Sequence, residues 1–337
     1  MAGKKKILII RMANIGDVIR ATPLLRLLKT ENSGASVDFL TSFGMNFIFD
    51  GNPYVDRVYN FDKVSRIIRK IYRKKSIKRL REQNYSDIYL LETDRDYVSF
   101  AIEIKGHSTK LHAYDAVGTQ NDIDFAVSYD ESKNVIERFL MLSDKKDFNS
   151  GDYRMDLCCG SDRSYYYGAV VLHCFTTETP PYRGWRFDDM AECISRLCSC
   201  GHRVVVTGLK KHYDELSLLK KKCACEFELF IDHTIVELCS LLRSAGLVVS
   251  ADTGVFHMAR AYQTPVVGIW GATTRGDSGA LGPGKCTIIN RGCELAPCFG
   301  KDQEYFGSHI SCLDGSVTEC MRDFPLDEAM KAIDKYL

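Results

Sequence analysis

The stretch Ser250-Ala251-Asp252-Thr253-Gly254-Val255-Phe256-His257-Met258-Ala259 decides the fold class of this chain. An apolar run, Gly246–Val249, precedes it, and a second apolar run, Pro265–Trp270, follows it. This order predicts a strand, a tight turn, a helix and another strand, with Asp252 or Thr253 capping a helix that begins near Gly254. A helix N-terminus offers spare N–H donors and partial positive charge, so the turn is a candidate phosphate site. An ordinary capped helix of an α/β domain fits the same residues.

The same alternation of strands and helices fills both halves of the chain. In the first half, a helical pattern with Val18, Leu24 and Leu28 follows the loop that ends at Asp17. The strands expected in that half are Lys6–Ile10, Val37–Leu40, Arg57–Tyr59 and Asp87–Leu91. The second half is expected to contain the strands Ala169–His173, Arg203–Thr207 and Phe227–Phe230 and the helices Phe187–Cys200, His212–Lys222 and Thr234–Arg243.

The alternation stops between residues 145 and 167, where charged and polar residues dominate, and a domain boundary is expected there. We therefore expect one Rossmann-like domain over residues 1–163 and a second over 164–325, which includes a cysteine-rich segment, 286–320. A C-terminal helix is expected over 326–337. The predicted fold class is α/β, with two Rossmann-like domains that face a central cleft.

Length and composition agree with a globular protein of two domains. The chain has 337 residues, of which 45% are hydrophobic and 26% charged, and a single core rarely grows to this size. No apolar run approaches the roughly 18 residues of a membrane span, and Ile7–Ile10 is too short for the apolar part of a signal peptide. We expect a cytoplasmic protein whose 14 cysteines are thiols or metal ligands.

One segment departs from the near-neutral charge balance. Lys63–Arg81 contains ten basic residues and no acidic one, with apolar residues interleaved at near-helical spacing. Such a helix can lie on an anionic membrane surface or receive an anionic acceptor. The alternative is a solvated helix face with some affinity for nucleic acid, although no other segment suggests a nucleic-acid partner.

Several common enzyme signatures do not occur in the sequence. No G-x-G-x-x-G follows the first strand, and neither a Walker loop nor an H-E-x-x-H motif is found. Dinucleotide redox chemistry, P-loop hydrolysis and zinc-protease chemistry therefore lack their usual motifs.

Four blocks, in the family's order, resemble glycosyltransferase family 9, the ADP-heptose:lipopolysaccharide heptosyltransferases. The first and fourth blocks are the specific ones, and the second and third are weak signals alone. The blocks are Ile7–Val18 with Thr22-Pro23-Leu24; Leu172-His173 with Thr176-Thr177 and Arg183-Gly184-Trp185; Val205–Gly208 with Asp214-Glu215; and Asp252-Thr253-Gly254 with His257, continuing through Thr264–Val267 to Gly271-Ala272-Thr273.

The resemblance implies a GT-B enzyme that binds the acceptor in its N-terminal half and the nucleotide-sugar donor in its C-terminal half. It implies that Asp17 is the general base that takes the proton of the acceptor hydroxyl, although Asp17 could instead cap the following helix. We expect the acceptor to contact Asn14 and Gly16 in the Asp17 loop and Lys70 and Arg73 in the basic segment.

In the donor half, the resemblance assigns the sugar and the diphosphate to the turn Asp252-Thr253-Gly254, with His257 one helical turn later. A buried structural role for His257 is an open alternative. It also implies diphosphate contacts from Thr176 and Thr177, and a nucleoside contact from Glu215. Arg183 stands where the family usually has lysine. Arginine keeps the positive charge but presents a planar, forked guanidinium to the phosphates.

The C-terminal cysteines raise the question of a metal. Cys293, Cys298, Cys312 and Cys320 lie within 28 residues and could hold one tetrahedral metal ion, zinc or iron, in a structural role. A branch of related heptosyltransferases that modifies autotransporter proteins holds iron in such a segment. Reduced structural thiols are the alternative, and no cofactor is expected to be required for catalysis.

These observations predict an inverting glycosyltransferase that moves heptose from ADP-heptose, or a related nucleotide sugar, to a lipopolysaccharide core acceptor. Such an enzyme would work in the cytoplasm or peripherally on the inner face of the cytoplasmic membrane. Three alternatives stay open: a protein (autotransporter) heptosyltransferase with a cysteine-bound metal, a non-catalytic scaffold that binds nucleotide sugars, and a sugar-nucleotide epimerase on the same fold.

Overall fold

The computed structural model describes residues 5–61, 66–115, 120–162, 164–175, 185–223, 225–271, 281–291, 313–314, 317–322 and 324–337. Its contacts divide the chain into two compact units, Met1–Cys159 and Gly160–Leu337. Each unit is built on its own six-stranded sheet, and every described pairing within these two sheets is parallel.

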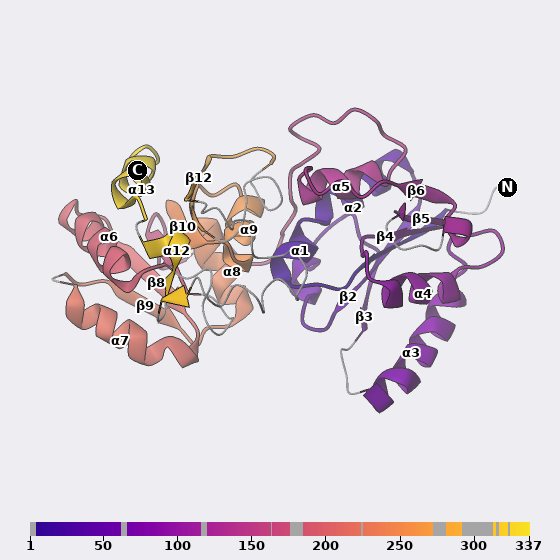
Figure 1. The fold of residues 1–337 in the computed structure, drawn as a ribbon, viewed down its shortest axis with the longest axis horizontal. Coiled ribbons are helices and arrows are strands. Elements are labelled where there is room, and N and C mark those ends of the chain that lie inside the picture. The colour runs from indigo at the N-terminus through magenta and orange to yellow at the C-terminus, as the bar shows by residue number, and fades with distance from the viewer. Residues whose placement is uncertain are drawn as a thin grey trace. The chain divides into compact units, whose positions relative to one another are not determined.

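The first unit alternates strands and helices from its start. Its described elements are β1 Lys6–Arg11, α1 Ile15–Ile19, α2 Thr22–Glu31, β2 Ser36–Ser42, η1 Asn46–Ile48, β3 Arg57–Phe61, α3 Arg66–Arg81, β4 Asp87–Leu90, α4 Arg95–Ile104, β5 Lys110–Tyr114, η3 Gln120–Asp122, β6 Phe125–Val127 and α5 Val135–Met141. The strand order is β3-β2-β1-β4-β5-β6. Figure 1 shows α2 and α5 on one face of this sheet and α3 and α4 on the other.

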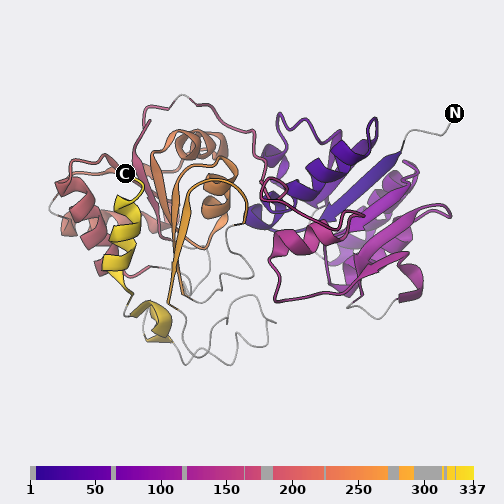
Figure 2. The ribbon, with the colours of Figure 1, turned by 90° about the horizontal axis from the view of Figure 1, so that it is seen from above.

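The second unit repeats this plan. Its described elements are β7 Val170–His173, α6 Phe187–Ser199, β8 Val204–Gly208, η4 Lys210–His212, α7 Tyr213–Lys222, β9 Glu228–Ile231, α8 Ile235–Ser244, β10 Leu247–Ala251, α9 Gly254–Ala261, β11 Val266–Trp270, β12 Cys286–Asn290, β13 Leu313–Asp314, β14 Val317–Thr318, α12 Glu319–Arg322 and α13 Leu326–Asp334. The six-stranded order is β12-β11-β10-β7-β8-β9, and β13 and β14 form a small antiparallel pair. Helix α13 packs against α6, as Figure 2 shows at the C-terminal end of the chain.

The central strands explain why both sheets are parallel. Ile7–Ile10 in β1 and Leu247–Ala251 in β10 are buried along their whole length. Strands that are covered by helices on both faces read as continuous apolar runs rather than as alternating patterns. The apolar runs in the sequence therefore correspond to the middle of each sheet.

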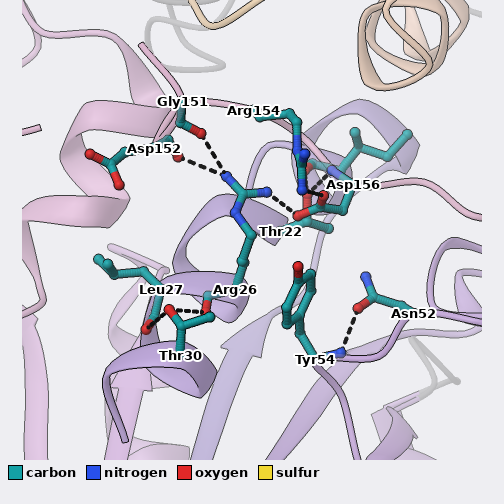
Figure 3. A network of polar contacts seen from close by, with 11 residues as sticks. Thr22, Arg26, Leu27, Thr30, Asn52, Tyr54, Gly151, Asp152, Arg154 and Asp156 are labelled. Carbon is teal, nitrogen blue, oxygen red and sulfur yellow. Dashed lines mark hydrogen bonds and ion pairs between the residues drawn. The ribbon is translucent and has the colours of Figure 1, made fainter. Parts of the chain in front are cut away.

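The segment that follows α5 is attached to α2, far away in the sequence. The Arg26 guanidinium forms an ion pair with Asp156 and donates to the carbonyl oxygens of Gly151 and Asp152, both at 3.1 Å (Figure 3). The backbone N–H of Asp156 donates to Thr22 Oγ1 at 2.8 Å. These bonds satisfy loop carbonyls that would otherwise need water, and they explain why the first unit extends to Cys159.

Three edge or near-edge strands, β5, β6 and β12, were not predicted from the sequence. β5 carries His112, whose Nε2 lies 3.2 Å from Asp87 Oδ1 and whose ring stacks on Tyr89 with the centroids 4.1 Å apart. A buried polar residue of this kind interrupts the apolar run by which a strand is predicted from sequence. β6 has three residues, and β12 lies at the end of its sheet, where fewer side chains need to be apolar.

Candidate active site

Both sheets contain the same topological switch point. In the first sheet the strand order reverses between β1 and β4, and in the second it reverses between β7 and β10. Ligands of open α/β sheets bind outside the carboxyl ends of the strands at such a reversal. Helix α1, with Asp17 in its first turn, follows β1, and the turn Asp252-Thr253-Gly254 follows β10, so both predicted segments lie at a switch point.

Asp17 lies in the first turn of the short helix α1 and is not at its N-cap. Asn14 occupies the N-cap position, and its side chain makes no capping hydrogen bond. Capping, the alternative role for Asp17, is therefore not supported by its position. The Asp17 side chain is 26% exposed, which leaves the carboxylate within reach of a ligand.

Two arginines contact the Asp17 carboxylate. Arg20, at the C-cap of α1, forms an ion pair with Oδ1, and Arg11 Nη2 lies 3.5 Å from the same oxygen. Arg11 in turn donates through Nη1 to Glu92 Oε2 at 3.0 Å. Burial disfavours the charged guanidinium, yet the pKa of Arg11 lies above its usual value because the carboxylates of Glu92 and Asp17 outweigh that cost. Arg11 therefore stays charged between two carboxylates.

The predicted acceptor residues fall at the same edge of the first sheet. Asn14 is exposed at the N-cap of α1 and Gly16 is buried in α1, while Arg73 lies on α3. Arg73 Nη2 donates to Glu103 Oε1 at 2.5 Å, and its guanidinium lies 5.4 Å from the centre of the Phe100 ring. Lys70 is on α3, but its side chain lies outside the described part.

Arg73 also lines a pocket at the ends of the first three strands. Its lining combines apolar and aromatic side chains with one cation and one carboxylate, and consists of Met12, Leu40, Phe61, Arg73, Asp96, Tyr97 and Phe100. Met12 directly follows β1, and Phe61 ends β3, so the pocket opens at the carboxyl edge that also carries Asp17.

In the second unit, α9 begins at Gly254, as the sequence predicts. Thr253 is at the N-cap in an extended conformation, but its side chain makes no capping hydrogen bond. The Thr253 hydroxyl instead lies 3.4 Å from Ser250 Oγ. Because the cap side chain does not use the first N–H groups of α9, these groups suit an anion.

Asp252 and His257 form a buried pair next to this turn. His257 Nε2 lies 3.6 Å from Asp252 Oδ1, and both residues are about 95% buried, at 4% and 5% exposure. His257 lies one helical turn after the start of α9, and this distance is long for a hydrogen bond. The pair places a buried carboxylate and a buried histidine beside the N-terminus of α9.

A second histidine cluster joins the ends of β7 and β8. His173 Nδ1 lies 2.7 Å from Thr207 Oγ1, and burial lowers the pKa of His173 to about 4, with a further lowering from His212. His212 stacks on Phe175 with the ring centroids 4.8 Å apart. His173 is therefore neutral at pH 7 and holds two neighbouring strands together at their carboxyl ends. Glu215 is exposed in the first turn of α7, close to this cluster in the sequence.

Other predicted site residues lie outside the described residues, namely Thr176, Thr177, Arg183, Cys293, Cys298 and Cys312. Cys320 is described and buried in the core of the second unit. A Cβ atom added at Gly271 would lie 2.7 Å from the Cys320 Sγ, so this thiol packs directly against the end of β11. Within the residues described, no group of three or more His, Cys, Asp or Glu side chains could hold a metal ion.

Glu92 and Arg20 contact the site but were not predicted from the sequence. Arg20 could have been found from its spacing, because residues i and i+3 of a helix share a face. Glu92 follows the apolar run of β4, and its proximity to Arg11 depends on β4 lying beside β1 in the sheet.

Comparison with known proteins shows the family to which the chain belongs. The profile of Glycosyltransferase family 9 (heptosyltransferase) matches residues 73–308. Lipopolysaccharide heptosyltransferase 3 of Escherichia coli (strain K12) is 24% identical over 77% of this chain and 80% of its own length. Lipopolysaccharide heptosyltransferase 1 of Escherichia coli O18:K1:H7 is 22% identical over 86% of this chain and 93% of its own length.

Solved structures share the fold over nearly the whole chain. A family 9 glycosyl transferase from Veillonella parvula has a TM-score of 0.78 at 12% identity and covers 98% of this chain and 97% of its own. The E. coli ADP-heptose lps heptosyltransferase II has a TM-score of 0.75 at 16% identity and covers 98% of both chains. The iron-containing glycosyltransferase TibC of enterotoxigenic E. coli has a TM-score of 0.58 at 15% identity, covering 99% of this chain and 76% of its own.

These matches confirm the predicted fold class, α/β with two Rossmann-like halves of the GT-B kind. The family profile spans well over half of the chain, and the matched region includes the turn Asp252-Thr253-Gly254 and the ends of β7 and β8. The chain belongs to glycosyltransferase family 9, the heptosyltransferase family, and is a glycosyltransferase.

Proposed function

We propose that this enzyme transfers heptose from ADP-heptose to a lipopolysaccharide core acceptor. The observation that carries the proposal is the partly exposed Asp17 carboxylate at the β1/β4 switch point of a family 9 chain. Two curated relatives of the chain are lipopolysaccharide heptosyltransferases, and a solved structure of similar fold is an ADP-heptose lps heptosyltransferase.

In the proposed reaction, the acceptor hydroxyl attacks the anomeric carbon from the face opposite to the diphosphate. Asp17 accepts the hydroxyl proton as the new bond forms, and the bond from the anomeric carbon to the diphosphate oxygen breaks, which inverts the configuration. The N-terminal N–H groups of α9 receive the negative charge that develops on the leaving diphosphate. Asp252 accepts hydrogen bonds from hydroxyls of the donor sugar.

Thr176, Thr177 and Arg183 are proposed to bind the diphosphate, and Glu215 the nucleoside. Their assignment comes from the family resemblance. The exposed position of Glu215 at the first turn of α7 leaves its carboxylate available to a ribose hydroxyl. Asn14 and Gly16, next to Asp17, are proposed to contact the acceptor.

The basic helix α3 supports a lipid-linked acceptor. Its 16 residues carry no acidic side chain, and its last turn holds Lys78, Arg79 and Arg81. Basic residues on one helix attract anionic headgroups and the phosphate and carboxylate groups of a lipopolysaccharide core. Among the described helices, none has the length and apolar character needed to cross a membrane. We therefore propose a cytoplasmic enzyme that associates peripherally with the inner membrane surface.

The proposal predicts which mixture releases ADP. Purified enzyme with ADP-heptose should release ADP, and a heptosylated product should appear by mass spectrometry, when lipid A core in anionic vesicles is added. Anionic vesicles without core and an autotransporter fragment are the control acceptors, and GDP- and UDP-sugars are the control donors. ADP release only with the autotransporter fragment would indicate that the acceptor is a protein and not the lipopolysaccharide core. Donor binding without any ADP release would indicate a non-catalytic scaffold.

A structural metal ion is proposed for the C-terminal cysteines, as zinc or iron. The likeness to the iron-containing TibC and the four cysteines 293, 298, 312 and 320 motivate it. Because thiolate ligands would saturate the ion, we assign it no step in the reaction. Elemental analysis of enzyme purified without chelator should find about one ion per chain. Cys312→Ser should lose this ion, whereas Cys200→Ser, an exposed cysteine of the second unit, should keep it. A metal-free wild-type enzyme would contradict the proposal.

A further inference from the structure

Glu92 lies in the first unit at the carboxyl end of β4, and neither the family resemblance nor the sequence motifs assign it a role. We infer that Glu92 is a positioning residue for Asp17 and that it acts through Arg11. The inference rests on the proposed function of Asp17 as the base. It follows from the hydrogen bonds of Arg11, from the anchoring of Glu92 and from the charges around both groups.

Two hydrogen bonds and one longer ion pair hold the guanidinium of Arg11. Its Nη1 donates to the Leu91 carbonyl oxygen and to Glu92 Oε2, each at 3.0 Å, and its Nη2 lies 3.5 Å from Asp17 Oδ1. The guanidinium is planar and its nitrogen atoms have fixed relative positions. Once Nη1 is bound at the end of β4, the direction of Nη2 toward Asp17 is set.

Glu92 is anchored to β1 by its second oxygen. The Met12 backbone N–H donates to Glu92 Oε1 at 2.6 Å, so one carboxylate binds the side chain of Arg11 and the backbone of the next residue. β1 and β4 are adjacent in parallel register, and the Leu91 N–H donates to the Ile10 carbonyl oxygen at 3.0 Å. Glu92 therefore spans the switch point and connects the start of the Asp17 loop to the neighbouring strand.

The charges explain why this arrangement matters for a base. Two arginines beside one carboxylate stabilise its ionised form and weaken it as a proton acceptor. The Arg11 side chain is 15% exposed and the Glu92 side chain 12%, so water screens their interaction only partly. The negative charge of Glu92 offsets part of the positive charge of Arg11. Asp17 is therefore a stronger base than it would be beside the same two arginines without Glu92.

The other groups near Arg11 leave this balance unchanged at neutral pH. Burial raises the pKa of the Tyr114 hydroxyl well above its usual range, so that Tyr114 stays neutral. The Arg138 guanidinium lies 4.7 Å from the centre of the Tyr129 ring, and Arg11 itself lies 5.2 Å from that of Phe139. η1, which packs on α1, contributes no titratable side chain. Arg20 also forms an ion pair with Asp17 and is common to all variants compared below.

The test is a titration of Asp17 that does not depend on turnover. In protein labelled with ¹³C at the aspartate carboxyl carbon, the Asp17 signal is the one lost in Asp17→Asn. In Glu92→Gln, the Asp17 midpoint should fall by about one pH unit, because Arg11 then faces one carboxylate. In Arg11→Gln it should rise by about as much. Glu92→Asp keeps the charge and should hold the wild-type midpoint more closely than Glu92→Gln.

Kinetics provide the second readout. In Glu92→Gln, kcat for ADP release should fall about tenfold with little change in the KM for ADP-heptose, and the acidic limb of the pH profile should move to lower pH. Glu228→Gln removes a carboxylate that pairs with Arg203 on the second unit and serves as the matched control. An Asp17 midpoint in Glu92→Gln that stays at the wild-type value or rises would overturn the inference. A wild-type enzyme that releases no ADP would instead refute the proposed function, and the titration would still decide the coupling.

Discussion

Replacing Asp17 by asparagine should lower kcat for heptose transfer by about 10³-fold, the size of effect expected when a general base is removed. Asparagine has nearly the same shape and can still accept hydrogen bonds from Arg11 and Arg20, but it cannot take the acceptor's proton. Asp17 lies in the first turn of α1 and is not its N-cap, so the substitution does not remove a capping side chain. The fold and donor binding should therefore survive.

Initial rates of ADP release measure the loss, and a melting curve with and without ADP-heptose shows whether donor binding persists. Asp162→Asn is the matched control, because Asp162 is an exposed carboxylate that also pairs with an arginine, Arg243. Wild-type rates in Asp17→Asn would exclude this residue as the base. A loss of rate together with a loss of the donor-induced rise in melting temperature would assign it to binding.

Replacing Asp252 by asparagine should lower kcat/KM for ADP-heptose by about 100-fold, because hydrogen bonds from sugar hydroxyls to a buried charged acceptor are among the strong ones. The Asp252 side chain is buried beside the N-terminus of α9, and its Oδ1 lies 3.6 Å from His257 Nε2. The amide keeps the volume, so the core of the second unit should stay packed.

The matched control for this change is Asp232→Asn. Asp232 is an exposed residue just after β9 with a φ of 62°, a conformation that asparagine adopts readily. Steady-state kinetics with varied ADP-heptose provide the measurement, and the control should keep wild-type values. An unchanged kcat/KM in Asp252→Asn would remove this residue from the donor site and leave it a structural partner of His257.

Much of the fold could be predicted because the central strands of both sheets are buried on two faces. The apolar runs at residues 7–10 and 247–249 mark these strands directly. The contacts divide the chain after Cys159, whereas the sequence placed the boundary after residue 163. The strands that escaped prediction are short, lie toward the sheet edges or carry a buried polar pair, as His112 does with Asp87. Local pattern is weakest where hydrogen bonding to a neighbour, rather than apolar burial, holds the strand.

Some residues of the candidate site could likewise be predicted from the sequence, and others could not. Asp17 and the turn at Asp252 each lie directly after an apolar strand, so their place at a carboxyl edge follows from chain order alone. The buried pairing of Asp252 with His257 also follows from local geometry, since a short stretch of helix separates them. The contacts of Arg11 do not, because Glu92 is about 80 residues away in the chain.

The sequence by itself determined the two alternating α/β halves, the loop that presents Asp17 and the helix that begins at Gly254. These features depend on apolar patterns and turn residues that lie close together in the chain, so a short segment is enough to predict them. Only the tertiary structure decided that β4 lies beside β1 and β10 beside β7, and hence which loops meet at each switch point. Strand order depends on the packing of whole helices against both faces of a sheet, and that energy belongs to no single segment.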